Sequence, residues 1–189
     1  MILHLAAAAA IALTPASLPD GFLLLEAQAK GHKNWSVDDT RTLPFVLNPC
    51  FKGHWDKGRL EARTVVYSPE GEGGGKWEQL IVYKDVSSAE AAMKGLRGQL
   101  AKCPPVAKEA APSHYWYKPL DLGDDALRAG TRFDEGGTHD VVVRRGAAIM
   151  IYGQNDWPTK SLPLKGFRPL IKLAEEMLGQ VCRLPEAAC

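Results

Sequence analysis

The chain has 189 residues, of which 46% are hydrophobic, 24% charged and 8% aromatic. This composition is ordinary for a globular protein and excludes a disordered, a collagen-like or a coiled-coil chain. Lys and Arg number 23 and Asp and Glu 22, which gives a formal net charge of +1. Because nucleic-acid-binding proteins usually concentrate basic residues on one face, this balance gives no reason to expect nucleic acid as a partner.

The N-terminus predicts export. Residues 1–17 read MILHLAAAAAIALTPAS and contain no Asp, Glu, Lys or Arg. The apolar run from Leu5 to Leu13 is too short to span a membrane, which takes about 20 residues, but it fits the core of a signal peptide. The basic residue that normally precedes such a core is missing, and an Ala-rich first helix is the alternative. We expect residues 1–17 to be a signal peptide, no membrane span to follow, and the mature chain to be secreted or extracytoplasmic.

The four cysteines fit an oxidising compartment. Cys50, Cys103, Cys182 and Cys189 all follow the expected signal peptide, and an even number in an exported chain predicts two disulfides. A zinc site would need cysteine ligands about two to four residues apart, and no two cysteines are that close. Cys103 and Cys182 both fall on apolar faces at the ends of predicted helices. This favours Cys103–Cys182 with Cys50–Cys189, and a local Cys182–Cys189 loop is the alternative.

The strands are predicted in a single domain over residues 61–189, after a signal peptide and an irregular lead-in over 18–60 that prolines interrupt. Segments rich in β-branched and aromatic residues predict strands; these segments are 61–67, 77–83, 114–117, 126–133, 140–145 and 147–152. The glycine-rich residues 68–76 predict a hairpin loop between the first two strands. Gly146 predicts a turn that needs a positive φ between the last two.

Two amphipathic helices complete the predicted domain. Ser87 and Glu90 form a capping box, and apolar residues then recur at intervals of three and four up to Cys103. A second helix is predicted over 166–183, with Pro169 in its first turn. Strands joined by short hairpins imply an antiparallel sheet. We therefore expect an α+β fold of about five or six strands, with both helices on one face and the other face free.

Several of these segments resemble a known family. They are the NPC at 48–50, the strands RTVVY and EQLIVY, the helix SSAEAAMKGLRGQLAKC, the LGD at 122–124, the hairpin VVVRRGAAIMIYG and the Cys-terminated last helix. Over roughly residues 43–189 they resemble the actinobacterial extracytoplasmic sensor-domain family, typified by the external domain of PknH-type serine/threonine kinases. The resemblance implies an extracytoplasmic binding domain of unknown ligand, with no catalytic residues to carry over. No kinase domain or transmembrane helix accompanies it, so it implies a free secreted relative.

A catalytic site has one candidate pair. His54 and Asp56, in the sequence KGHWD, would act as a general base and its orienting acid; a solvated loop is the alternative. His139 and Asp140 are adjacent in a predicted strand, so their side chains point to opposite faces and cannot form a dyad. No spacing supplies the converging ligands of a metal site. We therefore expect no metal and no cofactor. If His54 and Asp56 form a catalytic pair, the alternative function is that of a small secreted hydrolase or isomerase.

Aromatic side chains are the better candidates for binding. Trp77, at the start of a strand, is expected in the core. Neighbouring residues of the strand at 114–117 point to opposite faces, so part of its aromatic cluster faces the free side of the sheet. Aromatic residues in loops either cover the edge of the core or contact a ligand. We expect a site for an apolar or carbohydrate-like small molecule, or for an extracytoplasmic protein, formed by Trp55, Tyr115, Trp116, Tyr117 and Trp157.

Overall fold

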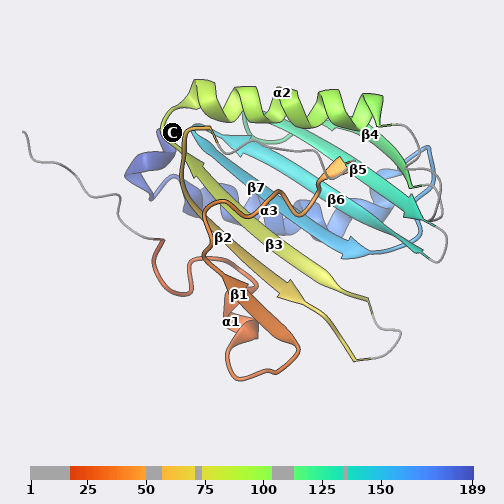
Figure 1. Cartoon of the computed structure of the whole chain (residues 1–189), viewed down its shortest axis with the longest axis horizontal. Helices are drawn as coiled ribbons and strands as arrows, with labels where there is room; N and C mark the ends of the chain where they lie inside the picture. Colours follow the sequence, from red (N-terminus) through yellow and green to blue (C-terminus); the bar gives the residue numbers. More distant parts are fainter. Residues whose placement is uncertain (1–17, 50–56, 71–73, 104–112, 134–135) are drawn as a thin grey trace, which may run out of the picture.

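The strands form one antiparallel sheet in a computed structural model that describes residues 18–49, 57–70, 74–103, 113–133 and 136–189. In these residues the sheet has seven strands in the order β1-β2-β3-β7-β6-β5-β4 (Figure 1). The strands are β1 (Trp35–Asp38), β2 (Arg59–Tyr67), β3 (Lys76–Tyr83), β4 (His114–Leu120), β5 (Asp125–Phe133), β6 (Gly136–Arg145) and β7 (Ala148–Asn155). The helices are α1 (Glu26–Ala29), α2 (Val86–Lys102) and α3 (Arg168–Val181), with 3-10 turns η2 (Leu164–Phe167) and η3 (Pro185–Ala187). The α+β class is confirmed.

The segment expected to be an irregular lead-in contributes to the fold, which corrects both its description and the strand number. It contains α1 and β1, and β1 pairs with β2 with Trp35 opposite Tyr67. Its residues Leu23, Leu25 and Phe45 are buried. The sequence does not predict this strand because it has only four residues, too few for their alternation to stand out, and three of them are exposed.

Arg63 of β2 holds the N-terminal segment to the sheet. Its side chain is 5% exposed and pairs with the carboxylates of Glu26 and Asp39, at 3.3 and 2.5 Å. The same guanidinium donates from Nη2 to the carbonyl oxygen of Leu18 at 3.1 Å and from Nη1 to that of Pro19 at 2.7 Å. A buried guanidinium has five donors to satisfy, and here the backbone of the N-terminal segment takes up two of them.

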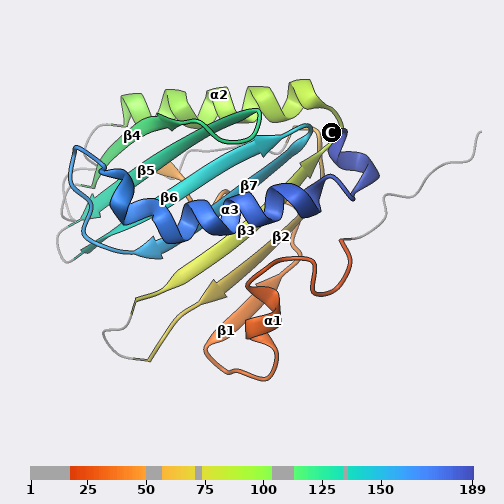
Figure 2. The same cartoon turned by 180° about the vertical axis from the view of Figure 1, so that it is seen from behind.

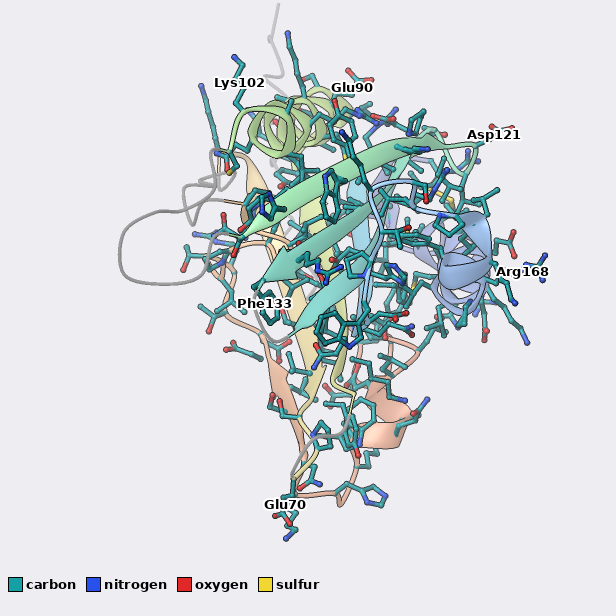
Figure 3. All side chains as sticks on the ribbon, turned by 90° about the vertical axis from the view of Figure 1, so that its right-hand side faces the viewer. Glu70, Glu90, Lys102, Asp121, Phe133 and Arg168 are labelled. Carbon is teal, nitrogen blue, oxygen red and sulfur yellow. A yellow bond between two sulfur atoms is a disulfide. The ribbon has the colours of Figure 1, made fainter. Side chains whose placement is uncertain are left out.

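The two long helices lie on opposite faces of the sheet, which corrects the expected packing on one face (Figures 2 and 3). One core forms between α2 and strand residues that include Ile81, Leu127, Val142, Ile149 and Ile151. The other forms between α3 and strand residues that include Val82, Val141, Val143, Ala148 and Met150. Unbroken apolar runs such as VVV and AAIMI are typical of strands that are covered on both sides. Both faces are therefore covered by a helix.

Local contacts fix the start of α2 and the turn after β6. The N-cap of α2 is Asp85 rather than Ser87, and Asp85 accepts a hydrogen bond from the backbone N–H of Ser88 at 2.7 Å. Hydrogen bonds from Ser88 and then Ser87 lower the pKa of Asp85 to about 2. Gly146 has a φ of +54°, which confirms the turn predicted between β6 and β7.

The disulfide among the described residues joins Cys182 to Cys189, with 5.5 Å between their Cα atoms. It overturns the favoured pairing of Cys103–Cys182 with Cys50–Cys189. Cys103 follows α2 and Cys182 follows α3, and the sheet separates these two helices. After α3 the chain turns back through η3, where the carbonyl of Ala187 accepts a hydrogen bond from the N–H of Ala147 at 2.6 Å. Cys103 is not free, but Cys50 lies outside the described residues, so the second disulfide stays a prediction.

Candidate functional site

A pocket of about 370 Å³ opens on the α2 face of the sheet. Its volume is in the range of small-molecule sites. The described lining comes from strands β2 to β6, from the segment before β2 and from Ser113 just before β4, and none of it comes from α2. Phe133 lies at the end of β5, where it is labelled in Figure 3. The lining residues are Val46, Leu47, Asn48, Val66, Trp77, Ser113, Tyr115, Thr131, Phe133, Thr138 and Asp140.

Three residues in one row across the sheet shape this pocket. Trp77 of β3 lies opposite Gly153 of β7, and Gly153 lies opposite Asp140 of β6. A Cβ atom on Gly153 would overlap both the indole nitrogen of Trp77 and the Oδ1 atom of Asp140. Because Gly153 has no side chain, the indole of Trp77 crosses β7 and donates from Nε1 to Oδ1 of Asp140 at 3.0 Å. The glycine is therefore what lets the two side chains meet.

Asp140 is a buried acid inside the pocket lining. The residue is 1% exposed, and its Oδ2 atom accepts a second hydrogen bond from the hydroxyl of Thr138 at 2.7 Å. Burial raises the pKa of Asp140 to about 7, against the smaller opposing effects of the hydrogen bonds from Thr138 and Trp77. The carboxyl group therefore exchanges its proton near neutral pH. Perturbed acids of this kind gather at functional sites, although structural groups share the property.

A second buried acid, Glu78, lies on the opposite face of the sheet. Its carboxylate accepts hydrogen bonds from the backbone N–H groups of Leu24 and Leu25, at 3.1 and 2.6 Å, and from the hydroxyl of Tyr152 at 2.8 Å. Burial raises the pKa of Glu78, and these three hydrogen bonds lower it by less. Glu78 therefore ties the N-terminal segment to β3 and β7.

The predicted binding residues separate in the structure. Tyr115 lines the pocket, and Tyr117 packs against the core on the same face. Trp116 points to the other face and packs against the core beneath α3. Trp157 is 57% exposed and lies outside the pocket, with the guanidinium carbon of Arg132 5.2 Å from its ring centroid. The alternation along this strand is as expected, but only one of these four aromatic residues lies in the pocket.

The remaining predicted residues either lie outside the described residues or occupy a different position from the one expected. Trp55 and the candidate catalytic pair, His54 and Asp56, lie outside the described residues. Trp77 lines the pocket instead of being enclosed in the core. Neither Trp77 nor Asp140 was expected in a site. The signal in the sequence is a single acid directly before the apolar run VVV.

His139 confirms that no dyad forms with its neighbour Asp140. Its ring lies on the α3 face, with the ring centroid 4.3 Å from that of Phe167. Its Nδ1 atom is 2.8 Å from Oδ2 of Asp156.

The described part of the chain contains no group of three or more His, Cys, Asp or Glu residues that would hold a metal ion. No helix in that same part is long and apolar enough to cross a membrane.

No family model and no curated protein matches the chain. Among solved structures, it is similar to the extracellular domain of PknH from Mycobacterium tuberculosis, with a TM-score of 0.53 and 8% sequence identity. The match covers 86% of this chain and 98% of the PknH domain. The two chains share a fold. The resemblance to the PknH domain drawn from the sequence is confirmed at this level. A second similar structure is a putative uncharacterized protein, the Rv0999 ortholog, from Mycobacterium smegmatis, with a TM-score of 0.36, 10% identity and coverage of 85% and 93%.

Proposed function

We propose that this chain is an extracytoplasmic, sensor-like domain that binds a small molecule in the pocket around Asp140. The observation that carries the proposal is a buried carboxyl group that faces a cavity of small-molecule size. The fold of an extracellular domain, the predicted signal peptide and the Cys182–Cys189 disulfide support the location. An extracytoplasmic protein that responds to the bound state is the second partner we expect.

The surroundings of Asp140 argue for a ligand rather than a structural role. A buried carboxylate normally has a cationic partner or several backbone donors, because burying it unpaired is costly. Asp140 receives hydrogen bonds from two neutral side chains, Trp77 and Thr138. Within the residues that the structure describes, no cation lies within ion-pair distance of it. A buried carboxyl group without a cationic partner lowers the free energy of unfolding when it ionises. We therefore infer that the role of Asp140 is to contact a ligand in the pocket.

A fragment screen by NMR tests this proposal. The oxidised chain from Leu18 to Cys189 is labelled with ¹⁵N, and fragments that shift the indole N–H signal of Trp77 are collected. Thr131→Trp fills the pocket, because Thr131 is part of its lining, and Lys118→Trp places the same bulk on an exposed residue of the neighbouring strand. We expect the first variant to lose binding about tenfold or more and the second to keep it. Fragments that bind both variants equally well would contradict the proposal.

The alternative of a small hydrolase or isomerase rests on His54 and Asp56, and it stays a prediction. No contact of a described residue favours it.

A further inference from the structure

We infer that the pocket selects a protonated amine on an apolar body, with the ammonium group placed against Asp140. This inference rests on the proposed function and specifies the chemistry of its ligand. Three features of the lining lead to it: the sign of the charge, the unused hydrogen-bond acceptors and the aromatic walls.

The charge of the described lining favours a cationic ligand over an anionic one. Asp140 is the only carboxylate among the described lining residues, and they include no Lys, Arg or His. Tyr115, on β4, is the other titratable side chain that faces the cavity. His139, the neighbour of Asp140 in β6, points to the other face of the sheet, where its Nδ1 atom contacts Asp156. A ligand carboxylate or phosphate would therefore be desolvated next to a like charge, whereas a cation would gain a partner.

The hydrogen bonding of Asp140 leaves space for a donor with several N–H groups. A carboxylate has about four acceptor positions, and Trp77 and Thr138 occupy one on each oxygen. An ammonium group has three donors, while an alcohol has only one. Hydrogen bonds between charged partners are also shorter and stronger than those between neutral partners. The carboxyl group therefore favours an amine over an alcohol of the same shape.

The remaining walls fit an organic cation rather than a bare metal ion. Trp77, Tyr115 and Phe133 supply three aromatic side chains, and aromatic faces attract ammonium groups. Val46, Leu47 and Val66 add aliphatic surface for an apolar body. A metal ion would need several acidic or imidazole ligands, and the described residues contain no such cluster. The ligand class that fits is a small primary or secondary amine with an aromatic or aliphatic body.

Three compounds of matched shape test the inference: phenethylamine, 2-phenylethanol and 3-phenylpropionate. Their affinities are measured at pH 7.5 by calorimetry and by the Trp77 indole N–H signal, in the unmodified chain and in Asp140→Asn. The amide that this substitution introduces has the size of the carboxyl group and can keep both neighbours, so the fold is retained. We expect the amine to bind about tenfold tighter than the alcohol, the difference between a charge-assisted and a neutral hydrogen bond. In Asp140→Asn this preference should fall below about twofold.

Calorimetry in buffers of different ionisation enthalpy gives a second measurement. Because an ammonium group favours the carboxylate, amine binding near neutral pH should release a proton from Asp140, and no release should occur in Asp140→Asn. Equal or tighter binding of the alcohol or the acid, with the Trp77 signal shifted, overturns the inference and leaves the proposed function standing. An amine preference that survives in Asp140→Asn also overturns it. If none of the three compounds shifts the Trp77 signal, the inference fails, and the fragment screen decides the proposed function separately.

Discussion

The two buried acids of the sheet differ in what satisfies them. Glu78, on the α3 face, accepts three hydrogen bonds, two of them from the backbone of the N-terminal segment. Asp140, on the α2 face, accepts two from side chains and lines a pocket. Burial raises the pKa of both. The difference teaches that a raised pKa alone does not mark a site: what distinguishes Asp140 is acceptor capacity that opens to a cavity.

The largest effect should follow from removing Glu78. In Glu78→Ala, two backbone N–H groups and the hydroxyl of Tyr152 lose their common acceptor in a buried position. We expect the free energy of unfolding to fall by about 4 kcal/mol, since each buried donor left unpaired costs about 1–3 kcal/mol. Urea denaturation measures this, and Glu78→Gln, which keeps one acceptor oxygen, should lose less. A loss below about 1 kcal/mol in Glu78→Ala would contradict the role of Glu78 in holding the N-terminal segment to β3 and β7.

A smaller effect should follow from adding one methyl group at Gly153, between Trp77 and Asp140. Gly153→Ala forces the indole of Trp77 away from Asp140, so we expect a loss of about 2 kcal/mol and a large shift of the Trp77 indole N–H signal. Gly98→Ala in α2 is the matched control, because outside its chain neighbours and the nearby backbone of its own helix no atom lies within 4 Å of the added Cβ. That control should be neutral or stabilising by up to about 1 kcal/mol. An unchanged indole signal in Gly153→Ala would contradict the geometry of the row.

The smallest effect should be that of Asp140→Asn at about pH 3, within about 1 kcal/mol of the unmodified chain, because at that pH both side chains are neutral in the folded and in the unfolded state. The folded chain keeps the proton of Asp140 up to pH about 7, whereas the unfolded chain loses it near the ordinary pKa of about 3.9. The stabilisation by this proton is therefore complete below that ordinary pKa and is lost as the pH rises through 7.

Asp140→Asn lacks this dependence, so its stability relative to the unmodified chain should increase between pH 4 and 7 and level off above. Urea denaturation of both chains at several pH values measures the difference, from which the contribution of Glu78 cancels. A constant difference across this range would contradict the raised pKa of Asp140, and with it the contrast between the two acids.

The fold was largely predictable from the sequence, and the site was not. Strands β2 to β7 and helices α2 and α3 have clear periodicity or β-branched runs, while β1 has only four residues, too few for their alternation to predict a strand. The opposite placement of the helices was readable in the apolar run at 141–143, which needs cover on both sides. Tyr115 was predicted, but Trp77 and Asp140 act together only because Gly153 lies between them. That relation depends on the register of three strands, which residue patterns alone do not give.

Trp77 and Glu78 are consecutive residues of β3, and this has a practical consequence. The indole N–H of Trp77 reports on the pocket, and the amide N–H groups of Leu24 and Leu25 report on the acid next to it. These probes report on opposite faces of the sheet, although the two side chains they sense belong to consecutive residues of one strand. Two ¹⁵N spectra of the unmodified chain, one with and one without a bound compound, therefore show which face of the sheet the compound affects, and no substitution is needed.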